Sequence, residues 1–250
     1  MRTLAAVLAF LLAGCTTAPD GATTDGAGTT TTGPPVECTA SPAQTEGPYF
    51  LDGRADRADI RSDGSGSALP DGYDEYVEAP ERIDLRASGG SAQAGAAVQL
   101  TLKVSLAVDG KCAPLQGAQV DLWHANATGV YSGFGTGVGH DFLRGRQTTA
   151  PDGTVTFITI WPGWYPGRAV HMHVKVRSFA AGSASTEYTS QLYFQDTQNA
   201  LVLAAPPYSS HPGAMRNADD AIYRSGGPSL LVAAQPSGQA WAASKELVVA

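Results

Sequence analysis

The sequence predicts an all-β protein, an antiparallel β-sandwich with long loops and little helix. Apolar residues alternate with polar or small ones in several short stretches, and this period of two is typical of half-buried strands. Glycine and proline clusters separate most of these stretches, and the chain contains 29 Gly and 16 Pro. No stretch shows the apolar stripe of an amphipathic helix. Short strands between turn signals favour a sandwich or barrel.

The clearest strand is predicted over residues 98–108, where Val and Leu alternate with polar or small residues and the turn Asp109-Gly110 follows. Further strands are expected at residues 118–124, 154–160, 170–177, 190–194, 230–233 and 246–249. Residues 195–228 have few apolar runs, so we expect long loops there, with one short helix around residues 218–223.

The first residues are expected to direct export rather than to fold. Arg2 and the apolar run that follows indicate a signal peptide, because about ten apolar residues are too few to span a bilayer. The run ends in Leu12-Ala13-Gly14-Cys15, which resembles the lipobox of bacterial lipoproteins. This resemblance implies cleavage of residues 1–14 and lipidation of Cys15, with ordinary secretion as the alternative. The protein is therefore expected to be exported and held on the extracytoplasmic side of the cell membrane by a lipid anchor.

Residues 15–36 are mostly Thr, Gly, Ala, Asp and Pro, and we expect a flexible tether there. Residues 37–250 suffice for one sizeable domain. In an oxidising compartment, the pair Cys38 and Cys112 indicates a disulfide, with a pair of thiolate metal ligands as the alternative. The net charge of -7 and the lack of a basic run argue against nucleic-acid binding.

Two of the 5 histidines, His171 and His173, lie one residue apart in the stretch GRAVHMHVKV. The alternation predicts a strand on which both imidazoles point to the same polar face, while the residues between them face the core. Neutral imidazole is the commonest metal ligand, so the pair suits a metal ion. Taken alone, the pair fits a wet sheet face with two uninvolved histidines equally well, and only its context can decide.

Five motifs together resemble the intradiol ring-cleavage dioxygenases, which include protocatechuate 3,4-dioxygenase and catechol 1,2-dioxygenase. They are QTEGPYF at residues 44–50, LWHANATGVY at 122–131, WPGWYPGR at 161–168, HMH at 171–173 and QLYF at 191–194. The motifs fall in the family's order, and the resemblance runs from about residue 45 to the C-terminus. It implies a non-haem Fe(III) held by four side chains, Tyr131, Tyr165, His171 and His173.

The resemblance also implies a reaction. A catechol would bind the iron through both oxygens and displace Tyr165 and a hydroxide, which take its two protons. O2 would then open the ring between the hydroxyl-bearing carbons and give a muconate-type diacid. Arg168 matches a family arginine that stabilises charge on the substrate ring, and Gln191 matches a glutamine beside it. Two phenolates and a hydroxide balance the charge of Fe(III), and a bound cation lets tyrosines ionise below their usual pKa near 10.

Some features depart from the better-known members of the family. The interval from Tyr165 to His171 is shorter than in the cytoplasmic members, so their substrate preference does not carry over. A tether stands where catechol 1,2-dioxygenases have a helical dimerisation segment, which leaves the oligomeric state open. His124 is expected to be structural, and His140 and His211 are expected to be exposed.

Two other functions compete with a dioxygenase that acts on a catechol and O2. The first is a non-catalytic ligand-binding lipoprotein on the same sandwich, since fold alone does not determine function. The second is a hydrolase with zinc at the histidine pair, which would not need the tyrosines.

Overall fold

The structure is a computed structural model of the chain, and it describes residues 38–51, 87–88, 91–138, 140, 142–180 and 183–250. The chain divides into two compact units, Met1–Val36 and Glu37–Ala250, and every described residue belongs to the second. The expected signal peptide at residues 1–14, the tether at 15–36 and Cys15 lie outside the described residues. Within the described ranges, no helix has the length and apolar character needed to span a membrane.

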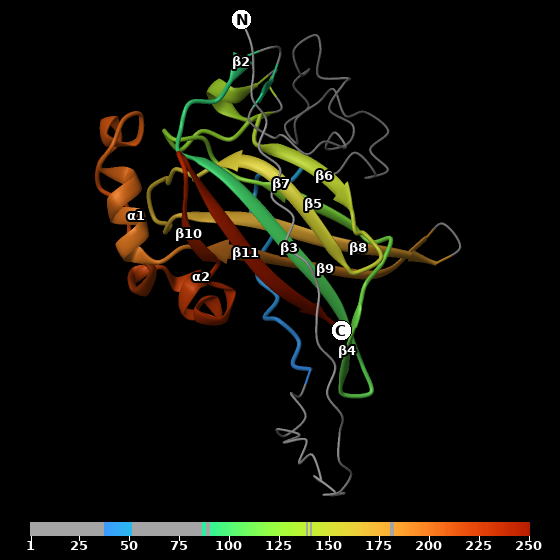
Figure 1. The fold of residues 1–250 in the computed structure, drawn as a ribbon. Coiled ribbons are helices and arrows are strands. Elements are labelled where there is room, and N and C mark those ends of the chain that lie inside the picture. Colours follow the sequence, from blue (N-terminus) through green and yellow to red (C-terminus); the bar gives the residue numbers. More distant parts are fainter. Residues whose placement is uncertain (1–37, 52–86, 89–90, 139, 141, 181–182) are drawn as a thin grey trace, which may run out of the picture. The chain divides into compact units, whose positions relative to one another are not determined.

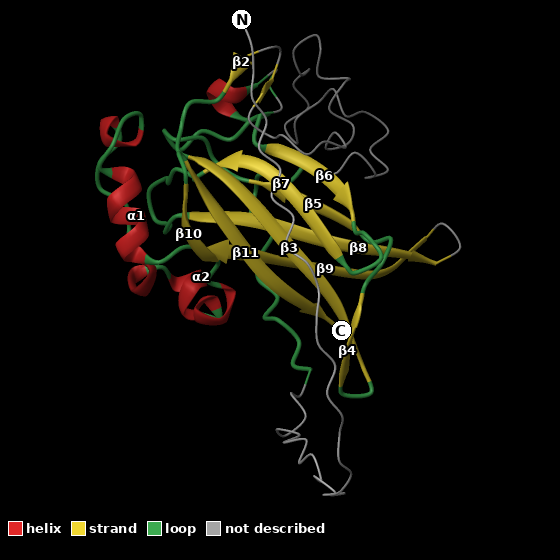
Figure 2. Cartoon of the chain, in the orientation of Figure 1, coloured by secondary structure: helices red, strands yellow, loops and turns green. Residues whose placement is uncertain are grey.

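Two sheets form the body of the described domain (Figures 1 and 2). The strands are β1 (Ala87–Ser88), β2 (Ser91–Ala92), β3 (Ala97–Val108), β4 (Lys111–Pro114), β5 (Gln119–Trp123), β6 (Arg144–Thr148), β7 (Thr154–Ile160), β8 (His171–Ala180), β9 (Ser183–Tyr193), β10 (Ala233–Ser237) and β11 (Ala240–Val249). One sheet has the order β10-β11-β3-β4, and β7 also pairs with β3. The other has the order β6-β5-β8-β9, and β1 and β2 form a separate pair. The predicted all-β sandwich is confirmed.

The core lies between the two larger sheets. Inward-facing side chains of β3 and β8 belong to one apolar cluster and are at most 1% exposed: Val98, Leu100, Leu102, Val104, Met172, Val174 and Val176. Burial of each such side chain contributes about 1.5–3 kcal/mol relative to an exposed one. The alternation that predicted these two strands therefore also determines which face of each sheet points to the core.

The sequence predicted antiparallel pairing, but one pair of strands is parallel. β11 runs parallel to β3, with Trp241 opposite Val98 and Val249 opposite Leu106. A parallel pair needs a long connection between its strands, and nearly the whole domain separates these two in sequence. The sheet is therefore mixed, and the C-terminal strand completes it beside the first long strand.

Several strand boundaries differ from the predicted ones. The strand expected at residues 230–233 begins instead at Ala233, because the residues before it form the 3-10 helix η5 (Gly227–Leu230) with a proline in its first turn. β9 and β11 begin well before the apolar stretches that signalled them. β4 and β6 were not predicted: all four residues of β4 are exposed, and β6 is rich in polar residues.

The two α-helices lie at one end of the domain (Figure 2). The helical elements are α1 (Asp196–Leu203), α2 (Ala221–Arg224), η2 (Gly135–Gly137), η3 (Tyr208–Ser210), η4 (Asn217–Asp219) and η5. The predicted short helix corresponds to η4 and α2. α1 lies where few apolar runs had predicted a loop. Only Asn199 and Val202 of its residues are buried, so no apolar stripe marks this helix in the sequence.

The second face of β8 is also buried, although the alternation predicted a half-buried strand. His171, His173, Lys175 and Arg177 are at most 5% exposed. Residues 38–51, which we call the N-terminal strap, lie against this sheet: Gln44 N donates to Thr189 O of β9 at 3.0 Å. Glu46 forms an ion pair with Lys175. The strap thus covers the polar face on which the histidines lie.

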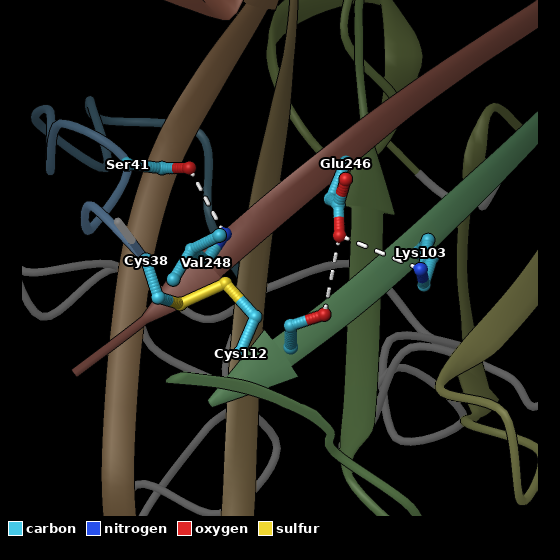
Figure 3. Close-up of a disulfide and its surroundings, with 7 residues drawn as sticks. Cys38, Ser41, Lys103, Cys112, Glu246 and Val248 are labelled. Carbon is cyan, nitrogen blue, oxygen red and sulfur yellow. Dashed lines mark hydrogen bonds and ion pairs between the residues drawn. A yellow bond between two sulfur atoms is a disulfide. The ribbon is translucent and has the colours of Figure 1, made fainter. Parts of the chain in front are cut away.

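The strap begins at a disulfide between Cys38 and Cys112 of β4, which confirms the predicted pairing (Figure 3). Close to it, Ser41 N donates to Val248 O at 2.8 Å and Val248 N donates to Ser41 Oγ at 3.0 Å. A covalent bond to β4 and two hydrogen bonds to β11 therefore fix the start of the strap to the first sheet. With both thiols in the disulfide, they are not thiolate metal ligands.

Candidate metal centre

Two loops bring the predicted tyrosines towards the histidine strand. Tyr131 lies in the loop between β5 and β6, and Tyr165 lies in the loop between β7 and β8. The loops touch backbone to backbone: a Cβ on Gly129, whose φ is +85°, would lie 2.2 Å from the Trp164 carbonyl oxygen. A Cβ on Gly163 would likewise lie 2.1 Å from a backbone oxygen of the facing loop. The glycines of both motifs are therefore needed for this close approach.

The two histidines meet at their ring tips. The Nε2 atoms of His171 and His173 lie 3.1 Å apart, and both residues are at most 2% exposed. His171 Nδ1 lies 2.6 Å from the Ala169 carbonyl oxygen, so Nδ1 carries the proton and Nε2 keeps its lone pair. Tyr131 Oη lies 3.5 Å from this Nε2. Three potential ligand atoms therefore converge on one buried point.

Tyr165 borders the same point from the outer side. Its ring centroid lies 5.6 Å from that of His171 and 5.8 Å from that of Tyr131. Tyr165 is partly exposed, whereas Tyr131 is 3% exposed. All four predicted ligands thus gather in one cluster, with Tyr165 as its most accessible member.

Arg168 and Gln191 flank this cluster. Arg168 Nη1 donates to Tyr165 Oη at 3.4 Å, and Nη2 donates to Gln191 Oε1. Gln191 is opposite His173 in the β8–β9 pairing, and its Oε1 also accepts from Tyr193 Oη at 3.0 Å. The structure thus brings the predicted arginine and glutamine together, with the guanidinium facing the exposed tyrosine.

The cluster is arranged for a cation. Burial raises the pKa of Tyr131 and of Tyr165 above their ordinary values, so both phenols keep their protons when no ion is bound. Burial lowers the pKa of His171 to about 3 and that of His173 well below its ordinary value, so both imidazoles are neutral. Neutral imidazoles are ready ligands, and a strong cation would ionise the phenols.

The distances also fit a single metal ion. Two atoms that each lie about 2.1 Å from one ion are about 3.0 Å apart at a right angle and about 3.6 Å apart at 120°. The observed separations are 3.1 Å between the two Nε2 atoms and 3.5 Å between His171 Nε2 and Tyr131 Oη. His173 Nδ1 is buried without a partner, so either tautomer leaves one ring nitrogen unsatisfied. A cation between the Nε2 atoms would satisfy both lone pairs.

The donor set points to iron rather than to zinc in a structural site. Imidazole nitrogen and phenolate oxygen suit iron, and zinc structural sites typically use thiolates. Among the described residues, no group of three or more His, Cys, Asp and Glu side chains could hold a metal ion. In this part of the chain, the tyrosines are therefore needed to complete a site around the histidine pair.

Three residues of the site were not singled out by sequence reasoning. Tyr49 of the strap stacks on Tyr131 with ring centroids 4.3 Å apart. Arg144 donates from Nη1 to Tyr49 O at 2.9 Å and from Nη2 to Ser132 O at 2.9 Å, so it links the strap to the backbone directly after Tyr131. Asp220 Oδ2 accepts a hydrogen bond from Arg168 Nε at 3.0 Å. Tyr49 lies in a quoted motif, whereas nothing in the local sequence marks Arg144 or Asp220.

The other histidines lie outside the cluster. His124 Nδ1 donates to Ala125 O at 2.9 Å, and its Nε2 accepts from Thr159 Oγ1 at 2.7 Å, so both nitrogens are used within the fold. His140 is exposed, as expected. His211 is only partly exposed, because its ring packs against Trp164 with centroids 4.4 Å apart.

Comparisons with known proteins agree with this fold. Residues 76–204 match the family described as Dioxygenase. Catechol 1,2-dioxygenase 1 of Acinetobacter lwoffii is 36% identical over 100 residues, which cover 32% of this chain and 32% of that protein. The chain thus spans about a third of the length of that curated relative.

Solved structures match over most of the chain. The intradiol ring-cleavage dioxygenase from Tetranychus urticae is 25% identical, with a TM-score of 0.65, over 85% of this chain and 94% of that one. The dioxygenase domain of a dioxygenase carbohydrate-binding protein fusion from Streptomyces sp. SirexAA-E is 29% identical, with a TM-score of 0.54, over 84% and 98% of the two chains. The chain belongs to the dioxygenase family, and the solved structures that it resembles include an intradiol ring-cleavage dioxygenase.

Proposed function

We propose that this chain is an Fe(III)-dependent intradiol dioxygenase. It cleaves catecholic aromatics with O2 between the two hydroxyl-bearing carbons and gives muconate-type diacids. The observation that carries the proposal is the cluster of two tyrosines and two histidines with the Arg168 guanidinium directed at its accessible side. Tyr131, Tyr165, His171 and His173 would hold the ion. When bound, a ferric ion would take a catechol through both oxygens and draw electron density from its ring, which activates the ring towards O2.

The two tyrosines have different roles in this proposal. Tyr131 is buried and held between Tyr49 and the histidines, so it remains a fixed ligand. Tyr165 is partly exposed, so it can move aside when a catechol arrives and accept one of the catechol protons at Oη. Arg168 Nη1 lies 3.4 Å from that oxygen and stabilises negative charge on either the phenolate or the substrate. The strap shields the histidines from water on the other side.

Turnover by the purified, iron-loaded protein tests the proposal. We expect oxygen uptake on addition of catechol, with the absorbance of a cis,cis-muconate growing in proportion. The Tyr165→Phe variant keeps the ring but loses the proton acceptor, so it should bind iron and turn over much more slowly, since general base catalysis typically contributes about 100-fold or more.

The matched control is Tyr188→Phe, which removes a hydroxyl that bonds Pro42 O at 3.0 Å on the same sheet, outside the ligand cluster. It should retain turnover. Bound iron without oxygen uptake across a panel of catechols would refute the enzyme and favour a ligand-binding protein. Activity that is supported by zinc and unaffected by Tyr131→Phe and Tyr165→Phe would favour the hydrolase.

We further propose that the protein is an exported lipoprotein anchored through Cys15. The disulfide between Cys38 and Cys112 supports export, because stable disulfides are rare in the cytosol. Labelling of cells with a radioactive fatty acid should mark the wild-type protein and not the Cys15→Ser variant. Equal labelling of the two proteins would refute the anchor.

A further inference from the structure

A buried carboxylate holds the arginine of the candidate centre. Asp220 is 1% exposed, and its Oδ2 accepts from Arg168 Nε at 3.0 Å and from Ala169 N at 2.9 Å. Its Oδ1 accepts from Ile222 N at 2.7 Å and from Tyr223 N at 3.3 Å, which caps α2. Asp220 therefore connects a short surface helix to the side chain that faces Tyr165.

The two edges of the guanidinium have different partners. Asp220 fixes the Nε edge, whereas Nη1 lies 3.4 Å from Tyr165 Oη and 3.4 Å from His171 Nε2, and Nη2 donates to Gln191 Oε1. A free arginine side chain carries about 2 kcal/mol of rotamer entropy, so a long, partly exposed arginine needs several contacts to keep one orientation. Asp220 at Nε and Gln191 at Nη2 hold two of the three guanidinium nitrogens and so determine the plane of the group.

We propose that Asp220 is a positioning residue for the dioxygenase reaction: it orients Arg168 so that Nη1 faces the substrate side of the metal centre. This inference rests on the proposed function and adds a residue that lies outside all five sequence motifs. Asp220 accepts hydrogen bonds from Arg168, Ala169, Ile222 and Tyr223 and from none of the predicted ligands, so we infer that it acts through Arg168.

Orientation and charge predict opposite effects when the carboxylate is removed. The negative charge of Asp220 partly offsets the positive field of Arg168 at Tyr165. If only charge mattered, its removal would strengthen that field and leave catalysis equal or faster. If Asp220 orients the guanidinium, its removal lets the group turn away from Tyr165, and catalysis becomes slower.

The Asp220→Asn variant separates these roles from helix capping. Asparagine is as good an N-cap as aspartate, so α2 keeps its cap through Oδ1. The amide nitrogen then replaces Oδ2 and faces two N–H donors, so the contacts to Arg168 and Ala169 are lost. The matched control is Asp196→Asn. Asp196 accepts from Asn217 N at 3.1 Å in the same region of the fold and does not contact Arg168.

Steady-state kinetics with catechol give the first readout. We expect Asp220→Asn to retain iron and its visible band but to lose about tenfold or more in kcat/KM, as is typical when a supporting partner of a site residue is removed. Asp196→Asn should stay within about twofold of the wild type. In an Arg168→Gln background, Asp220→Asn should cause no further loss. Wild-type kinetics in Asp220→Asn, or an equal loss in both backgrounds, would overturn the inference.

A second readout requires no turnover. In proton–nitrogen NMR spectra of the protein with diamagnetic Ga(III) in place of Fe(III), the Nε–H of Arg168 should give a slowly exchanging signal, identified by its absence in Arg168→Gln. Asp220→Asn should lose that signal, and Asp196→Asn should keep it. An unchanged signal in Asp220→Asn would overturn the inference even if the wild type does not cleave catechol, whereas an inactive wild type refutes only the proposed function.

Discussion

Replacing Cys38 and Cys112 together with serine should lower the free energy of unfolding by about 4 kcal/mol. The two residues are 74 positions apart, and a crosslink that closes such a loop removes about 15 cal/mol/K of entropy from the unfolded chain, or about 4.4 kcal/mol at room temperature. The folded state should lose little, because the strap keeps its contacts to β9, to Lys175 and to Tyr131.

Urea unfolding of the wild type and the double variant measures this difference. The variant should keep its colour with Fe(III) in the absence of urea, since the ligand cluster does not include the disulfide. Reduced wild-type protein should unfold at the same urea concentration as the double variant. The Cys15→Ser variant is the control, because its thiol lies outside the domain, and it should unfold like the wild type. A loss below about 1 kcal/mol would show that the unfolded chain is not constrained as this reasoning requires.

Three other predictions follow from local geometry. Gly47 has a φ of +70°, and an added Cβ would lie 3.2 Å from His173 Cε1, whereas Gly110 has a φ of +74° with open space around it. Thermal unfolding should show that Gly47→Ala and Gly110→Ala each lower the free energy of unfolding by about 1–2 kcal/mol. Only Gly47→Ala should shift the visible spectrum of the iron-loaded protein, and equal spectra of the two variants would contradict this. Burial lowers the pKa of His124 from 6.5 to about 4, so the unfolded chain takes up a proton that the folded state does not. The contribution of His124 to stability should therefore fall as the pH drops from 6.5 towards 4, by roughly 1.4 kcal/mol per unit. Urea titrations of His124→Gln should show a stability that falls less steeply with pH, by about that amount; identical slopes would refute the assignment. Asp121 Oδ2 forms a buried ion pair with Arg177 Nη2 at 2.6 Å. Asp121→Asn should break it and lower the free energy of unfolding in urea by about 3 kcal/mol, while a loss below about 1 kcal/mol would argue that the pair is not desolvated.

The alternation of residues in β3 and β8 was enough to predict the strands, their core faces and the common direction of His171 and His173. It could not predict that the second face of β8 is buried too. That burial depends on the strap, whose residues lie far from β8 in sequence and carry no regular pattern. In the same way, α1 was not predicted because its contacts to the sandwich involve a polar side chain, Asn199, that receives a hydrogen bond from Trp161.

The candidate ligands were found because each lies in a motif with a characteristic spacing. Residues that support them carry no such signal. Asp220 lies 52 positions from Arg168, and Arg144 lies 95 positions from Tyr49, so only the folded chain brings these pairs together. The sequence therefore predicted the candidate metal ligands, and the structure adds the groups that contact and orient these side chains.

The visible absorption spectrum of the protein loaded with Fe(III) tests the central claim most directly. We expect a tyrosinate-to-iron band that weakens in Tyr131→Phe, shifts when catechol is added without oxygen, and persists in His140→Ala, whose imidazole is exposed. Iron content measured on the same samples should fall in His171→Ala and His173→Ala. A protein that stays colourless after Fe(III) is supplied would contradict the ligand assignment and, with it, the proposed reaction.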